Sequence, residues 1–356
     1  MCQSSASVRL GIFTKMEMAG GSEFRAVEMA NAISQLQGYQ SVLLIERKMP
    51  SRLREMVRPE VEIQEGVFTQ PNIEPLYSLD HLLIINTDSR DFTTAAYWEG
   101  RSARHCHRVD LSKIKQMVFL FNFIVSPSTQ LPDIQKQTRD VRIITANSKF
   151  YQEISDQLRY EAVRHYPRLQ LESPIDPEIA QSKTISSRLR FGAHSLGNGD
   201  KWNSQWPELI KMVNEKSAEG IVWNFMGMPE RLSLKMEASN VHCRKEFCTP
   251  VREFLREVDV FVFFVGWNRE EAWSRSVAEA MTTGCPVITT SRGGNKNQVT
   301  HGNTGFICQD LGQFVQSCQR LVTDPFLREA MMINARKKAR SFASEVVVRR
   351  FLDFIQ

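Results

Sequence analysis

Cysteine is scarce and scattered in this sequence, with seven residues among 356. No Cys-x-x-Cys pair occurs, and the one close pair, Cys243 and Cys248, has no second cluster that would complete a zinc site. An odd number of dispersed cysteines is typical of reduced thiols. A disulfide framework and a structural zinc site are therefore both unexpected.

Long apolar runs are also missing. No segment approaches the ~18 apolar residues that a membrane-spanning helix needs, and no basic segment followed by an apolar run indicates a signal peptide at the N-terminus. We therefore expect a cytoplasmic protein, with association at a membrane surface or with nucleic acid as open alternatives. The formal net charge of +5 permits an anionic partner without requiring one.

What the sequence does contain is a regular alternation of apolar runs and helical patterns, which favours α/β domains with parallel sheets. A length of 356 residues indicates about two domains. We predict two Rossmann-like, doubly wound domains facing a cleft, over residues 1–170 and 191–340, with a linker over 171–190 and a last helix over 341–356. The sequence predicts buried strands over residues 8–14, 40–46, 81–86, 116–125, 141–147, 189–196, 220–227, 258–266, 285–290 and 304–309.

The most informative stretch is REEAWSRSVAEAMTTGCPVITTSRGG, residues 269–294. It follows a predicted buried strand, and we expect a helix to begin near Ser274 and to end at Gly284. Free amide groups at a helix N-terminus bind phosphate. Glu271 precedes this helix and Glu279 lies inside it. A carboxylate accepts hydrogen bonds from vicinal hydroxyls. A phosphate site with a carboxylate on either side therefore fits a nucleotide sugar, which has a sugar on each side of its phosphates. The alternative is that both glutamates are solvated, as most glutamates are.

This stretch resembles the Glu-x7-Glu segment of GT-B glycosyltransferases, especially the retaining enzymes of family 4. It shares with them Glu-Ala-Met, Gly-x-Pro-Val, a Gly-Gly pair and Gly-x-x-Gly-Phe. The resemblance implies a GT-B fold whose last helix returns to the N-terminal domain. It also implies metal-independent transfer of a hexose, with retention, from a UDP- or GDP-sugar, which is a co-substrate, so no cofactor is expected.

The resemblance also assigns roles to the residues that match the motif. It implies that Glu279 holds the donor ribose and that Glu271 holds the donor hexose. The β-phosphate would face backbone amides of four consecutive residues, which are Trp273, Ser274, Arg275 and Ser276.

Further positions match the family more loosely. Gly20 and Gly21 resemble its N-terminal Gly-Gly loop, although an ordinary βα turn would look the same. Lys201 matches the lysine that neutralises the donor diphosphate, with a solvated loop lysine as the alternative. The usual arginine is absent, and His194 and Ser195 occupy its approximate place. The positive charge of the missing arginine would then come from Lys201 alone or from another cation. The candidates are Lys15, Arg275 and Lys296.

Residues for the nucleobase and the acceptor are less defined. Gly227 and the backbone around Phe247 are expected to border the base, whose identity stays open. Asn122 stands near the position where the family often carries a histidine. His105, His107 and Asp110 lie close together in the sequence, but no third ligand is near the two histidines, so a metal site is not expected.

Two basic segments, residues 46–59 and 99–116, are either solvated faces or surfaces for an acceptor. A lipid-linked or glycan hydroxyl at a membrane surface and a hydroxymethylated base in DNA are the open acceptor classes. The sequence leaves the oligomeric state open. A nucleotide-sugar epimerase and a non-catalytic sugar-nucleotide-binding protein are the alternative functions.

Overall fold

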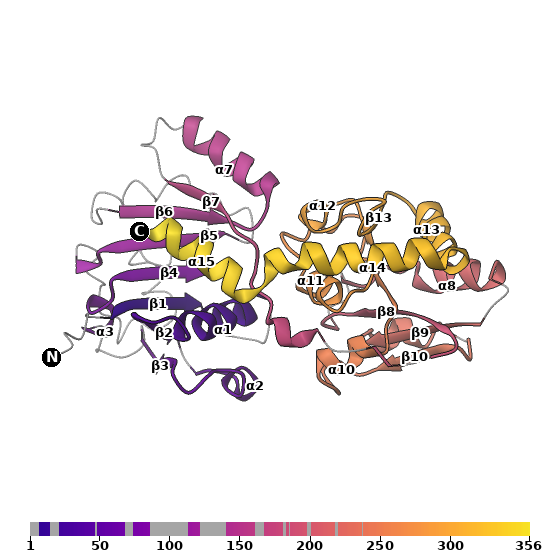
Figure 1. Ribbon diagram of the computed structural model, residues 1–356, viewed down its shortest axis with the longest axis horizontal. Coiled ribbons are helices and arrows are strands. Elements are labelled where there is room, and N and C mark those ends of the chain that lie inside the picture. The colour runs from indigo at the N-terminus through magenta and orange to yellow at the C-terminus, as the bar shows by residue number, and fades with distance from the viewer. Residues whose placement is uncertain are drawn as a thin grey trace. The chain divides into compact units, whose positions relative to one another are not determined.

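The protein is described by a computed structural model over residues 7–14, 21–46, 48–67, 74–85, 113–121, 140–160, 167–180, 183–184, 186–197, 201–217, 220–236 and 238–356. The chain divides into two compact units, Met1–Pro174 with Ser344–Gln356, and Ile175–Ala343 (Figure 1). Each unit is built around one parallel sheet. Within the described ranges, no helix is both long enough and apolar enough to span a bilayer.

The first unit contains a seven-stranded sheet in the order β3-β2-β1-β4-β5-β6-β7. Each of the five predicted strands of this half is present over its described residues, and most of its apolar residues there are buried. The strands are β1 (Val8–Thr14), β2 (Tyr39–Ile45), β3 (Glu62–Glu65), β4 (His81–Ile85), β5 (Gln116–Phe121), β6 (Asp140–Thr145) and β7 (Arg168–Gln170). The helices described in this unit are α1 (Gly21–Ser34), α2 (Ser51–Arg54), α3 (Glu74–Tyr77), α7 (Ser148–Tyr160) and α15 (Ser344–Ile355).

The C-terminal helix α15 belongs to the core of this first unit. Its buried residues Val347 and Phe351 share a hydrophobic cluster with Val27 and Ala30 of α1. The Gln116 side-chain amide on β5 donates to the carbonyl oxygen at the end of α15 at 3.0 Å. Figure 1 shows α15, in yellow, beside α1 in this unit. Helix α15 therefore completes the hydrophobic core on one side of the sheet that contains β1.

The second unit contains a six-stranded sheet in the order β10-β9-β8-β11-β12-β13. The strands are β8 (Leu189–His194), β9 (Ile221–Met226), β10 (Val241–Arg244), β11 (Val260–Phe263), β12 (Val287–Thr290) and β13 (Gly305–Cys308). The helices are α8 (Trp206–Glu215), α9 (Glu230–Ser233), α10 (Val251–Arg256), α11 (Arg275–Thr282), α12 (Asn295–Gln298), α13 (Leu311–Thr323) and α14 (Pro325–Ala339), with short 3₁₀ turns at Pro177–Ile179 and Arg340–Phe342.

The strand order of the second sheet fixes where a ligand can bind. The chain runs from β8 outward through β9 to β10 and then returns to β11, which pairs with β8 on its other side. The order therefore reverses between β8 and β11. In open parallel sheets, ligands bind at the carboxyl ends of the strands at such a reversal.

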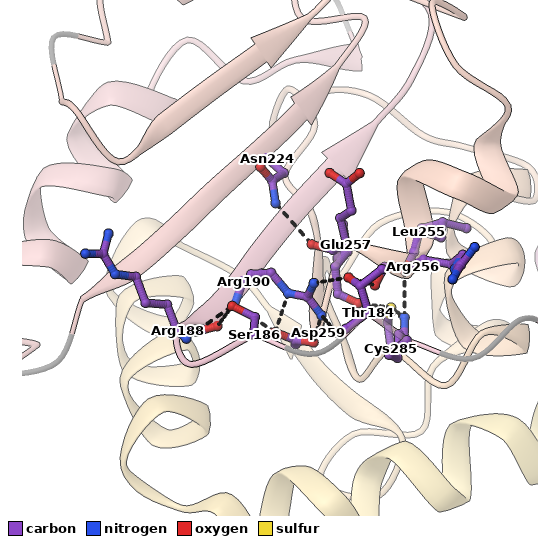
Figure 2. A network of polar contacts seen from close by, with 12 residues as sticks. Thr184, Ser186, Arg188, Arg190, Asn224, Leu255, Arg256, Glu257, Asp259 and Cys285 are labelled. Atoms are coloured by element: carbon purple, nitrogen blue, oxygen red, sulfur yellow. Dashed lines mark hydrogen bonds and ion pairs between the residues drawn. The ribbon is translucent and has the colours of Figure 1, made fainter.

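A network of polar contacts anchors the start of this unit (Figure 2). The Arg190 guanidinium on β8 forms an ion pair with Asp259 at 2.7 Å and donates to the Thr184 carbonyl at 2.9 Å. Nearby, the Asn224 side chain on β9 donates to the Glu257 carbonyl at 3.0 Å. Figure 2 shows the Arg190 side chain between Thr184 and Asp259, and the Asn224 side chain pointing to Glu257. The network holds the amino end of β8 against the turn between α10 and β11.

Candidate functional site

The candidate site of the second unit lies at the carboxyl ends of β8 and β11. β8 ends at His194, and the chain after β11 forms a loop that leads to α11. α11 begins at Arg275 with Ser274 as its N-cap, and ends before Gly284, whose φ of 83° is left-handed. These are the helix limits that the sequence predicts.

The start of α11 is held by a side chain from α12. The Ser274 amide donates to Oε1 of Gln298 at 2.9 Å, and Nε2 of Gln298 donates to the Ser274 carbonyl at 2.7 Å. The Ser274 hydroxyl itself forms no capping hydrogen bond. The expectation that the Ser274 amide faces a phosphate is therefore wrong in this structure, because that amide already has a partner.

Glu279 is a buried acid. Its residue is 4% exposed, Oε1 lies 2.7 Å from Nε of Arg275, and Oε2 lies 3.3 Å from Nε2 of His194. Loss of solvation raises the pKa of Glu279, and the Arg275 charge acts in the opposite direction. The alternative of a solvated surface glutamate is wrong for this residue.

His194 stands against this carboxyl group as a neutral imidazole. Burial lowers the pKa of His194 to about 3, and repulsion from Arg275 and Lys201 contributes to the shift. The rings of Phe254 and Phe261 approach the imidazole edge-on, at centroid distances of 5.8 and 5.4 Å. Nε2 of His194 is buried and has no hydrogen-bond partner within the described ranges. The contact with Glu279 is therefore not an ion pair, although its length would allow one.

Glu271 is also largely covered, with 14% of its side chain exposed. Its Oε1 lies 2.6 Å from Nε of Arg269 and 4.0 Å from Nζ of Lys201. The Gly294 amide donates to the Glu271 carbonyl at 2.6 Å, and Gly293 adopts a φ of 64°. A Cβ atom at Gly293 would overlap the Glu271 backbone. The structure therefore brings Glu271, Lys201 and the Gly-Gly pair together, and the solvated alternatives fail for this glutamate and for this lysine.

Three further predicted residues lie together at the ends of β8, β9 and β10. Gly227 has a φ of 85°, and a Cβ atom there would overlap the Ser195 carbonyl. Phe247 adopts a φ of 53°, which is uncommon for a residue with a side chain. The Glu246 carboxylate, which the sequence did not single out, accepts a hydrogen bond from the Gly197 amide at 2.7 Å. The loops after β8 and β10 are thus joined.

The remaining predicted residues of α11 and the Gly-Gly segment are placed as follows. Trp273 and Ser276 are partly exposed on either side of the helix start, and the Trp273 indole Nε1 is buried without a hydrogen-bond partner among the described residues. Lys296 is exposed. Of the cations proposed to replace the missing arginine, Arg275 is the one that the structure places against Glu279.

Several predictions fall on the first unit. Gly21 begins α1, and none of the described residues lies within 4 Å of a Cβ atom built on it. Lys113 and Lys115 of the second basic segment are described, and Lys115 forms an ion pair with Asp80. Predictions for Lys15, Gly20, His105, His107, Asp110 and Asn122 lie outside the described residues. Across the described ranges, no group of three or more His, Cys, Asp or Glu side chains could hold a metal ion.

Comparison with known structures defines the class of fold. Anabaena Alr3699/HepE, solved in complex with UDP and glucose, superposes with a TM-score of 0.68 at 14% identity, over 98% of this chain and 99% of that one. WaaG, a glycosyltransferase involved in lipopolysaccharide biosynthesis, gives 0.64 at 14% identity, over 98% and 100%. The fold is that of the GT-B glycosyltransferases, as the sequence predicts.

Sequence comparison is more specific for the second unit. Residues 209–338, from α8 to α14, match the family model "Glycosyl transferases group 1". Putative glycosyltransferase YtcC of Bacillus subtilis (strain 168) is 42% identical over 82 residues, or 22% of this chain and 20% of that protein. CapM of Staphylococcus aureus, a capsular polysaccharide biosynthesis glycosyltransferase, is 32% identical over 111 residues, or 30% and 28%. The matched region thus spans less than a third of these relatives.

A first prediction compares two glycines between β12 and β13. Gly293 packs against the backbone of another segment, and Gly302 does not. Gly293→Ala should lower the free energy of unfolding by more than ~2 kcal/mol, because it adds a clash with Glu271 to the strain of a left-handed backbone. Gly302→Ala is the matched control, since its φ of 76° is similar and nothing lies within 4 Å of the added methyl group. It should cost about 1 kcal/mol. Equal losses in urea denaturation would contradict the close packing at Gly293.

A second prediction concerns the protonation of His194. Because its pKa is lowered to about 3 from an unfolded value near ~6.5, the unfolded chain binds a proton in this range that the folded chain does not. This contribution to stability is present above pH ~6.5 and is lost as the pH falls toward 3. NMR of ¹⁵N-labelled histidine, assigned with His194→Asn, should show a neutral ring at pH 5. A midpoint near 6.5 would refute the burial argument.

Proposed function

We propose that the protein is a glycosyltransferase that moves a hexose from a UDP- or GDP-sugar to a hydroxyl acceptor, with retention of configuration and without a metal ion. One observation carries the proposal. Two glutamates, one before α11 and one inside it, are both withdrawn from solvent and lie beside cations at the carboxyl end of a doubly wound sheet. Such an arrangement suits a ligand with hydroxyl groups on both sides of a phosphate.

The donor's nucleoside and phosphate would bind at α11. The Glu279 carboxylate would accept hydrogen bonds from the ribose hydroxyls, and its low exposure strengthens those bonds. The positive end of the eight-residue helix, with the amides of Arg275 and Ser276, would face the β-phosphate. Alr3699/HepE, whose fold is similar, was solved with UDP and with UDP-glucose, which supports a uridine donor.

Stabilising the departing diphosphate matters more to the chemical step than a protein base does. Lys201 would stabilise the negative charge that develops on the departing diphosphate, and Glu271 would hold the hexose through its hydroxyls. Asn122 has an amide where the family often has a histidine, and an amide is no proton acceptor at neutral pH. We therefore propose front-face attack, in which the departing phosphate oxygen takes the proton of the acceptor hydroxyl and the new bond forms on the same face.

The other functions fit the site less well. A nucleotide-sugar epimerase needs acid and base residues that this motif does not supply. A non-catalytic binding protein would fit the loss of the arginine and the histidine, but it would have no need for Lys201 beside Glu271. The joint presence of Glu271, Glu279 and Lys201 favours a transferase.

Among acceptors, we propose a glycan hydroxyl over DNA. Of the similar proteins, CapM is a capsular polysaccharide biosynthesis glycosyltransferase and WaaG is involved in lipopolysaccharide biosynthesis. In the first basic segment, Arg54 of α2 forms an ion pair with Glu65 of β3. An arginine that is already paired leaves less positive charge for a DNA backbone.

A third prediction tests the donor. In a thermal-shift screen of nucleotide sugars, a true donor should raise the melting temperature by mass action. Glu279→Gln should remove that shift and reduce turnover at least 100-fold, because an amide offers only one acceptor atom to the ribose diol. The unliganded variant should melt within a few degrees of the wild type, since the substitution removes the cost of burying a charge. Unchanged turnover in Glu279→Gln would refute the assigned role.

A fourth prediction tests the acceptor. With the donor found in that screen, transfer should occur to oligosaccharide or lipid-linked sugar acceptors and not to duplex DNA containing hydroxymethylated bases. Binding of such DNA, followed by fluorescence anisotropy between low and moderate salt, should be weak. Tight binding with a steep dependence on salt would instead favour DNA as the acceptor.

A further inference from the structure

We propose that Arg275 is a ligand of the donor's diphosphate and that it reaches this position by exchanging partners, leaving Glu279 when the ribose binds there. The inference rests on the proposed function and adds a residue and an order of events to it. It assigns to the first turn of α11 the charge that His194 does not supply at the end of β8.

The starting point is the place of Arg275 in the helix. It is the first residue of α11, where phosphate is expected to bind, yet its side chain turns along the helix to Glu279, four residues later. A contact between residues four apart is usual on a helix surface, and the Cα–Cβ bond of Arg275 is tilted toward the helix start. A change of side-chain rotamer would therefore move the guanidinium from Glu279 to the phosphate position, with no change in the helix.

The second step is the coverage of Glu279. Its residue is 4% exposed, and Arg275 lies against Oε1 while His194 lies against Oε2. A ribose diol needs direct access to these oxygens. His194 is fixed between Phe254 and Phe261, whereas 17% of the Arg275 side chain is exposed. Arg275 is the more exposed of the two groups, and in the proposed exchange it is the one that moves.

The third step is the balance of charge at this end of the sheet. A diphosphate carries at least two negative charges, and Lys201 supplies one positive charge. His194 supplies none, because it is neutral. Its unpaired, buried Nε2 still marks the place as one prepared for a polar ligand. Arg275 lies against the same carboxyl group as His194, and Lys201 lies 4.0 Å from Glu271. Together they match the charge of a diphosphate.

The exchange couples two parts of the ligand. A nucleoside alone must displace Arg275 from Glu279 and leaves the guanidinium without a phosphate to bind. A nucleoside diphosphate displaces it and also provides its new partner. The diphosphate should therefore bind more tightly than the nucleoside. The difference in affinity should be larger than a phosphate contact with Lys201 alone would produce.

The experiment compares Arg275→Gln with wild type by calorimetry on UDP and, for the weaker ligand, by saturation-transfer NMR on uridine, with GDP and guanosine as a parallel pair. The variant should bind the diphosphate roughly ten- to hundredfold more weakly, as expected for a lost charge-assisted hydrogen bond. It should bind the nucleoside equally well or better, because Glu279 is no longer covered. Arg275→Lys keeps a cation and should recover part of the diphosphate affinity.

Arg340→Gln serves as the matched control, since it removes the same charge from an exposed residue of the same unit. It should change neither affinity by more than about twofold. If Arg275→Gln weakens UDP and uridine by the same factor, Arg275 only positions Glu279, and the proposal is overturned. Unchanged UDP affinity would overturn it as well. If the wild type binds neither UDP nor GDP, the proposed function fails first, and the inference falls with it.

Discussion

Burial of the Glu279 carboxylate is the constraint around which the second unit's site is organised. An isolated charge removed from water costs several kcal/mol, so a buried acid persists only where neighbouring groups compensate for it. Arg275 does so through an ion pair at 2.7 Å, and His194 adds a neutral contact that introduces no competing charge. The site thus keeps a carboxylate in a place of low solvation, where hydrogen bonds to a ligand are strongest.

The backbone around this carboxylate is held by contacts between segments that are distant in sequence. The Gln298 side chain forms hydrogen bonds with both the amide and the carbonyl of Ser274, which fixes where α11 begins. The Gly293–Gly294 turn packs directly on the Glu271 backbone, and a side chain at Gly293 would separate the two segments. As a result, the loop before α11 and the loop after β12 act as one rigid support. Such a support keeps two glutamates eight residues apart at a fixed spacing for the proposed donor.

The sequence predicts the long apolar strands and the limits of α11 well, because both depend on local composition and on glycine and serine signals. It does not predict β3 or β7, since EIQE is polar and partly exposed and β7 has only three residues. The same contrast applies to the site. Glu271, Glu279 and Lys201 follow from the resemblance to a motif, whereas Gln298 and Glu246 act through tertiary contacts. A side chain 24 residues from its partner leaves no periodic signal in the sequence, and Ser274 is misjudged for that reason.

Two features of the site are physically connected. His194 stands in the approximate place of the arginine that the resemblance leads one to expect, and Arg275 lies beside Glu279. An arginine at the end of β8 would stand beside Glu279 and supply a permanent charge, whereas His194, in a cage of Phe254 and Phe261, stays neutral. The charge of Glu279 is then offset by a cation from another position. Arg275 supplies that cation from within the helix, four residues away from the acid. The proposed exchange depends on this position, because one side chain on the first turn of α11 would serve both the carboxylate and the diphosphate.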